Sequence, residues 1–121
     1  MEKLKELLKD VDIYIANHAI FINKLEKAVK NKSPIDAVDC HSCKFGQNFD
    51  KDIRNDIPNY EPEIRKILEE IDQIHCTFHE KAIQLSKEND EEKKQEILKE
   101  IKGLSTQLFR KLLYLKKTVL S

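Results

Sequence analysis

The sequence predicts an all-α protein, an antiparallel four-helix bundle, and three observations support this fold class. Apolar residues make up 40% of the chain and charged residues 36%, a balance that is typical of amphipathic helices. Only two glycines and three prolines are present, so few positions interrupt a helix. Apolar residues also recur every three or four positions over long stretches. At 121 residues the chain has the size of one domain with one core, which we expect to span residues 1–121.

The first predicted helix runs from Glu2 to about Lys30 and carries a continuous apolar stripe. His18 occupies the position that continues this stripe between Ile15 and Phe21. Because residues of one stripe face the same side of a helix, the imidazole is expected to point into the bundle. His18 is therefore a candidate functional residue.

A short helix and an irregular corner are predicted between the first and second long helices. Ser33 and Pro34 read as an N-cap followed by proline at the first helical position. Gly46 then indicates a tight loop, and the run from Asp50 to Asn59 is rich in turn-forming residues. We expect a short helix, a loop and a connector in this order.

Two further long helices complete the predicted bundle. The next element opens at residues 61–63 with proline and two acids in its first turn. Its apolar face carries His75 and His79. Asn89 with Glu92 then offers a capping box for the last helix. A leucine-rich apolar stripe after it defines the rest of that helix.

Charge and hydropathy exclude several classes of partner. The 22 basic residues are balanced by 22 acidic residues, so no field of one sign exists to hold a nucleic acid. Apolar runs such as residues 20–22 are far shorter than the ~20 residues of a membrane span, and the N-terminus lacks the layout of a signal peptide. We expect a cytoplasmic protein without nucleic-acid or membrane partners. In that reducing compartment, the three cysteines are expected to be ligands, redox groups or core residues rather than disulfide partners.

His75 and His79 lie one helical turn apart, so they can share one metal ion. An isolated pair with this spacing is as often two partly buried polar side chains that bind no metal. Zinc takes four nitrogen or sulfur ligands, and two sets compete. Cys40 and Cys43 with the two histidines would form one set, but the 31 residues between its halves (44–74) far exceed the ~12 of a zinc finger. That set also leaves His18 unexplained. The set of His18, Cys43, His75 and His79 is favoured because it uses all of the inner histidines.

Three motifs occur in the order and placement of a known family. They are Asn17-His18-Ala19 on the first helix, Cys43-Lys44-Phe45-Gly46 after the connection, and His75-Cys76-Thr77-Phe78-His79 on a later helix. Over about residues 16–82 the chain resembles the bacterial chemoreceptor zinc-binding (CZB) domains. One position departs from the family pattern, which has an aromatic residue two positions after the glycine. Asn48 stands there, and Phe49, one position later, is a candidate to fill the same pocket.

The resemblance implies Zn2+ as the cofactor, held by His18, Cys43, His75 and His79, in a cytoplasmic domain that forms a homodimer. It also implies signalling to a chemoreceptor or diguanylate cyclase, in cis or in trans. We expect the domain to respond to zinc availability or to oxidation of its cysteine ligand, and to act on a chemotaxis or cyclic-di-GMP output protein. A closed four-ligand site has no position for a metal-bound water, so no enzymatic activity is expected. The alternatives are a haemerythrin-like iron-binding bundle and a metal-free protein-interaction bundle.

The remaining cysteines and the last histidine have less specific predictions. Cys40 is either a resolving thiol for an oxidised Cys43 or a corner residue without a role. Cys76 is predicted to fill the core beside His75, and His41 is expected to be exposed. Several apolar residues fall outside the main stripes and are expected to form a dimer surface or to thicken the core; they are Ile13, Ile20, Leu98, Phe109 and Leu113.

Overall fold

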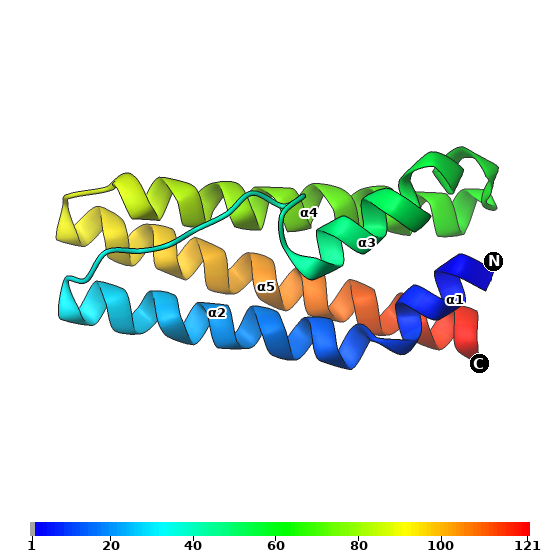
Figure 1. The fold of residues 1–121 in the computed structure, drawn as a ribbon, viewed down its shortest axis with the longest axis horizontal. Helices are drawn as coiled ribbons and strands as arrows, with labels where there is room; N and C mark the ends of the chain where they lie inside the picture. Colours follow the sequence, from blue (N-terminus) through cyan, green and yellow to red (C-terminus); the bar gives the residue numbers. More distant parts are fainter. Residues whose placement is uncertain (1) are drawn as a thin grey trace.

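The computed structural model describes residues 2–121, and every regular element within them is a helix (Figure 1). The elements are α1 (Glu2–Lys9), α2 (Val11–Asn31), α3 (Lys44–Asp52), the 3-10 helix η1 (Arg54–Asn59), α4 (Pro62–Lys87) and α5 (Glu91–Leu120). They confirm the predicted all-α helical bundle. Among these residues, none of the helices is long and apolar enough to cross a bilayer.

The bundle has up-down-up-down order, and its second member is half coil and half helix. In Figure 1, α2 and α4 run in one direction and α5 runs in the other. Between α2 and α4 the chain returns first as an extended coil over residues 33–39 and then as α3 and η1. The predicted corner between the first two long helices is therefore present, and it covers one side of the bundle.

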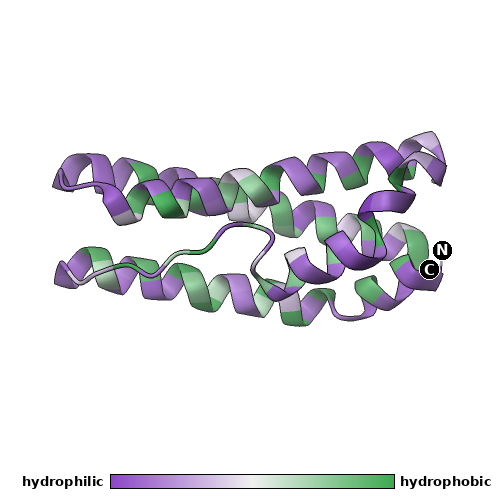
Figure 2. Ribbon diagram, turned by 45° about the horizontal axis from the view of Figure 1, so that its top comes forward, coloured by the Kyte–Doolittle hydropathy of each residue, from purple (hydrophilic) through white to green (hydrophobic). Residues whose placement is uncertain are grey.

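The core consists of two apolar clusters with a polar layer between them. Tyr14 of α2 and Ile71 of α4 belong to the first cluster. Ile22 of α2 and Phe78 of α4 belong to the second. Apolar residues therefore recur along each long helix and alternate with hydrophilic ones (Figure 2). The helical positions between the two clusters hold His18 and His75, so the sequence places imidazoles at the waist of the bundle.

The predicted helix from Glu2 to Lys30 is wrong at Asp10, where it divides into α1 and α2. Asp10 has φ −97° and ψ 10°, and its N–H donates to the carbonyl oxygen of Leu7 over 3.1 Å. Aspartate is a weak helix former in helix interiors because its side chain competes for the backbone. The break lets α1 change direction, and its leucines, Leu4, Leu7 and Leu8, are all buried in the first cluster.

The short helix predicted from Ser33 and Pro34 is also wrong, because residues 33–39 form an extended coil. Helix α2 ends at Lys32, which adopts the left-handed conformation (φ 56°), and the N–H of Ser33 closes this end on Ala28 over 2.9 Å. A residue before proline is pushed toward extended geometry. The chain therefore passes from the C-cap of α2 directly into coil, and the next helix, α3, begins only at Lys44.

Cys43 is the residue that caps α3. Its Sγ accepts a hydrogen bond from the N–H of Gly46 over 3.3 Å. Gly46 was predicted to lie in a tight loop, but it lies within α3. A Cβ at this position would collide with the carbonyl oxygen of Cys40. The glycine is therefore needed because the turn at residues 40–43 packs directly on α3.

Helix α5 begins one residue later than the capping box predicts. The side chain of Asp90, not that of Asn89, accepts a hydrogen bond from the N–H of Lys93 over 3.0 Å. An aspartate at this position also places its charge at the positive end of the helix. The predicted fourth helix is otherwise confirmed.

The two glycines give a matched test of the packing between α3 and the turn. Gly46→Ala is expected to lower the free energy of unfolding by about 1–3 kcal/mol, as overpacking does. Gly103→Ala, on α5 with nothing within 4 Å of the new Cβ, is expected to raise it by about 0.5–1 kcal/mol because alanine is the better helix former. Chemical denaturation of both variants measures the two changes. A Gly46→Ala variant as stable as the Gly103→Ala variant contradicts the close approach.

Candidate metal centre

Four side chains from three elements converge at the waist of the bundle. His18 comes from α2, Cys43 from the N-cap of α3, and His75 and His79 from successive turns of α4. One ligand atom from each lies within 4.8 Å of the others. The histidines are only 5%, 2% and 3% exposed, in chain order, and Cys43 is partly buried. The structure thus brings together all four residues that the sequence predicts as metal ligands.

Backbone carbonyls orient two of the three imidazoles. The Nδ1 atom of His18 lies 2.8 Å from the carbonyl oxygen of Tyr14, and that of His79 lies 2.9 Å from the carbonyl oxygen of Val38. A carbonyl accepts but cannot donate, so both Nδ1 atoms carry the hydrogen and both Nε2 atoms carry a lone pair. Both Nε2 atoms are buried without a hydrogen-bond partner. A bound cation would satisfy these two lone pairs.

Cys43 and His75 complete the cluster. The Sγ atom of Cys43 lies 3.2 Å from the Nε2 atom of His75. Phe45 covers the other side of the His75 ring, with 4.9 Å between ring centroids. His79 packs edge-on against the same ring, with 4.7 Å between centroids. The aromatic neighbours hold His75 in place without taking its inward nitrogen.

Burial keeps the histidines neutral. It lowers the pKa of His75 from 6.5 to about 2, with smaller contributions from the charges of His79 and His18. Burial likewise lowers the pKa of His18 and of His79, and it raises the pKa of the Cys43 thiol. Metal binding needs neutral imidazole and thiolate, so at neutral pH only Cys43 has to lose a proton.

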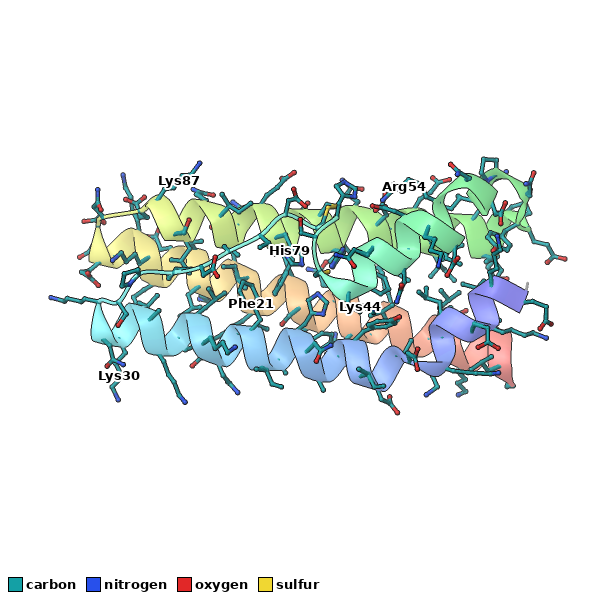
Figure 3. The ribbon with its side chains drawn as sticks, in the orientation of Figure 1. Phe21, Lys30, Lys44, Arg54, His79 and Lys87 are labelled. Atoms are coloured by element: carbon teal, nitrogen blue, oxygen red, sulfur yellow. A yellow bond between two sulfur atoms is a disulfide. The ribbon has the colours of Figure 1, made fainter. Side chains whose placement is uncertain are left out.

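A cavity of about 170 Å³ lies beside the cluster. Its lining includes His18, Cys43 and His79 together with the apolar side chains of Phe21 and Val38. Figure 3 labels His79 near the middle of the bundle, with Phe21 on α2 and Lys44 at the start of α3 close by. The cavity therefore offers a path to the ligand atoms on the side where the coil crosses the bundle.

Cys40 and Cys76 form a disulfide, which corrects the expectation that no cysteine of this chain is a disulfide partner. Cys76 is not a core-filling thiol, and Cys40 is neither free nor available as a thiolate ligand in this structure. The bond also has a signal in the sequence. Cys40 precedes Cys43 by three residues and Cys76 follows His75 directly, so any fold that joins Cys43 to His75 also brings the other two cysteines close together.

A charged network that the sequence analysis missed lies beside the disulfide. His41 is exposed, as expected, and its Nδ1 lies 2.6 Å from Asp50. Arg54 donates to Asp50 over 2.8 Å and, through both terminal nitrogens, to Asp72 over 2.8 Å each. The hydrogen bonds that Arg54 donates to Asp72 raise the pKa of the Arg54 guanidinium. The i,i+4 spacing of Asp50 and Arg54 could have predicted their ion pair from the sequence. The contact of Arg54 with Asp72 on α4 depends on the tertiary fold, so spacing could not predict it.

The position that departs from the family pattern has a structural role. The Asn48 amide donates to the Tyr14 hydroxyl over 2.8 Å, and Tyr14 supplies the carbonyl that orients His18. Phe49 is buried against Phe45, with 5.7 Å between ring centroids. Phe49 is thus a core residue, and its filling of the family's aromatic pocket stays a prediction.

Comparison with protein families gives one match. The family model described as "Chemoreceptor zinc-binding domain" matches residues 18–86, more than half of the chain. The match begins at His18, includes the other three clustered residues, and ends four positions beyond the span expected from the sequence motifs. Comparison with curated proteins and with solved structures gave no match.

The depressed histidine pKa values predict that the metal-free protein loses stability in mild acid. Below their usual pKa of 6.5, unfolded histidines take up protons that the buried ones cannot bind. The stability that the neutral buried imidazoles contribute is therefore fully present above pH 6.5, and it is lost as the pH falls below that value. Between pH 7.5 and 5.5, His75 removes about 1.4 kcal/mol from the free energy of unfolding, and His18 and His79 act in the same direction.

Denaturation in the presence of a chelator at several pH values measures this loss. His75→Leu is the informative variant, since it should reduce the loss by about 1.4 kcal/mol. A wild-type protein whose stability is the same at pH 7.5 and 5.5 contradicts the burial of neutral imidazoles.

Proposed function

The chain belongs to the chemoreceptor zinc-binding domain family, and from this premise we propose that it is a regulatory domain that binds one Zn2+ through His18, Cys43, His75 and His79. The observation that carries the proposal is the pair of buried Nε2 atoms, on His18 and His79, that have no hydrogen-bond partner. A buried polar atom without a partner destabilises a fold. An ion held by all four residues removes that penalty.

The donor set favours zinc over other cations. Three imidazole nitrogens and one thiolate form a tetrahedral set of the kind that zinc prefers. Within residues 2–121, no carboxylate belongs to the cluster of these four residues. Di-iron bundles of the haemerythrin-like kind need carboxylate ligands, so the cluster is a poor fit to that alternative.

Zinc would join three parts of the bundle. Its ligands come from α2, from the start of α3 and from α4, so occupancy is linked to the packing of the corner on the long helices. A site in which all four positions are taken by protein ligands leaves none for a reactive water. We therefore propose a structural and regulatory role for the metal, and no enzymatic activity.

Two inputs are compatible with this site, zinc availability and oxidation. Cys43 is the only ligand of the four that common oxidants modify readily, and an oxidised sulfur holds zinc more weakly. Loss of the ion would release the corner from α2 and α4. We propose that a cytoplasmic chemoreceptor or diguanylate cyclase, in cis or in trans, receives this change and passes it to chemotaxis or cyclic-di-GMP output.

We propose that the domain acts as a homodimer through an apolar face on α2 and α5. Ile13 and Ile20 are 58% and 54% exposed on α2. On α5, Leu113 and Tyr114 are about half exposed. Of the residues predicted to form a dimer surface or to thicken the core, Leu98 is buried in the second cluster, and Phe109 is partly buried against the first.

Metal analysis tests the zinc site directly. Purified wild-type protein is expected to retain one zinc per chain after dialysis, and His18→Ala and Cys43→Ala are expected to lose it. His41→Ala is the matched control, because His41 lies in the same turn but is exposed and outside the cluster. At a zinc concentration about 1,000-fold above the dissociation constant, the ion should add about 4 kcal/mol to the free energy of unfolding.

Two results would count against zinc. Stoichiometric iron with a visible absorption band would support the haemerythrin-like alternative. A metal-free protein whose melting is indifferent to a chelator would support an interaction bundle without a metal.

Sedimentation velocity tests the dimer. The double variant Ile13→Asp/Ile20→Asp is expected to sediment as a monomer at concentrations where the wild type is dimeric, because two charges would be buried in an apolar interface. Gln84→Asp, which adds a charge on an exposed position of α4, should leave the dimer intact. A wild-type monomer at 100 μM or so would contradict the proposed face, since stable dimers associate far below this concentration.

A further inference from the structure

The Cys40–Cys76 disulfide joins the two segments that carry three of the four clustered residues. Cys40 lies three positions before Cys43, and Cys76 lies between His75 and His79 on α4. The sulfur atoms of the disulfide and a His75 nitrogen lie within 4.8 Å of one another. The bond therefore ties the turn that holds the cysteine ligand to the helix that holds two histidine ligands.

The position of Cys43 depends on that of Cys40. The Cys43 Sγ atom lies 3.7 Å from the carbonyl oxygen of Cys40, and the same carbonyl packs against Gly46 without room for a Cβ. Asp39 holds the turn together by accepting from the His41 N–H over 2.9 Å and from the Ser42 hydroxyl over 3.0 Å. The turn and the start of α3 thus form one packed unit.

This unit also packs on α4 through the buried Phe45, whose ring lies against His75, but few polar contacts join the two. The preceding coil, residues 33–39, lies outside any helix, and one hydrogen bond joins it to a ligand, from the His79 Nδ1 to the Val38 carbonyl.

The ion pair between Arg54 of η1 and Asp72 of α4 is partly exposed, and Asp72 lies 3.8 Å from the Sγ atom of Cys76. It is bidentate and belongs to a network with Asp50 and His41, so it is a second, non-covalent link between this segment and α4. The disulfide is the covalent link between this unit and α4, and it lies next to the metal ligands.

We propose that Cys40 and Cys76 are a redox modification site that sets the zinc affinity of the domain, with the disulfide form binding zinc more tightly. This inference rests on the proposed zinc function. The disulfide holds Cys43 beside His75 before the ion arrives, so less conformational entropy is lost on binding. In the dithiol form the turn has to be ordered by the ion itself, and zinc binds more weakly.

The chemistry of the switch is thiol–disulfide exchange with a low-molecular-weight disulfide such as oxidised glutathione. The thiolate of one cysteine attacks the small disulfide, and one small thiol leaves. The second cysteine then attacks the mixed disulfide, forming the bond between Cys40 and Cys76 and releasing the second small thiol. The two protons of the cysteine thiols end on the two released thiols. Two protein sulfurs are oxidised and one small disulfide is reduced.

This switch acts in the opposite direction to oxidation of Cys43. Oxidation of the ligand weakens its hold on zinc, whereas oxidation of the neighbouring pair strengthens the site. The disulfide also removes two thiols that could otherwise compete for the ion beside His75. Mild thiol–disulfide oxidation would therefore secure the zinc, and only a modification of Cys43 itself would release it.

Zinc competition with a chromophoric chelator tests the proposal on three forms of the chain. The first is the oxidised wild type, and the second is the wild type reduced with a phosphine and desalted without oxygen. The third is the double variant Cys40→Ser/Cys76→Ser, which has neither the tether nor the extra thiols. The oxidised form is expected to bind zinc about tenfold or more tightly than the other two, as preorganisation of a loop implies. Circular dichroism confirms that each form is folded.

Several results would overturn the proposal. Equal affinity of the oxidised and reduced wild type means that the tether does not order the site, and this comparison needs no variant to fold. A reduced wild type that binds more tightly than the oxidised form means that the freed thiols act as ligands. If no form binds zinc, the proposed zinc function itself fails. Where zinc does bind, Cys43→Ser should weaken binding in both redox states, which separates loss of a ligand from loss of the tether.

Discussion

The burial of three neutral imidazoles at one level of the bundle is the constraint on which the rest of this structure depends. His18, His75 and His79 occupy positions that the apolar periodicity assigns to the core. Each brings two ring nitrogens into a region with little water. Backbone carbonyls satisfy Nδ1 of His18 and of His79, and their Nε2 atoms remain. A cation held together with Cys43 would satisfy those atoms, and it would connect the corner of the chain to the long helices.

The corner is shaped by that connection. Cys43 has to reach His75 from the start of α3, so the preceding turn lies close to α4 and against Gly46. This placement explains why a glycine occurs within a helix, where it would otherwise be unfavourable. It also brings Cys40 to Cys76. The ligand, the glycine and the disulfide are thus consequences of one close approach. The network of Arg54, Asp50 and Asp72 supports the same approach from the far end of α3.

Periodicity predicted the long helices and the inward position of His18, because both depend on local spacing alone. Local signals failed where two of them compete at one position. Ser33 and Pro34 looked like the start of a helix, but the left-handed Lys32 and the residue-before-proline effect lead into coil. The four clustered residues were predictable, though the choice between Cys40 and Cys43 depended on family motifs more than on spacing. The disulfide was missed because an argument from a reducing compartment outweighed the proximity that the ligand set itself required.

X-ray absorption at the zinc edge of the purified, zinc-loaded protein is the measurement that tests the central claim most directly. A ligand shell of one sulfur at ~2.3 Å and three nitrogens at ~2.0 Å is the result that the four clustered residues predict. A shell with two sulfurs would assign Cys40 or Cys76 to the metal and contradict the set proposed for this structure. A shell of nitrogen and oxygen alone would remove Cys43 from the site, and with it the link between the corner and α4.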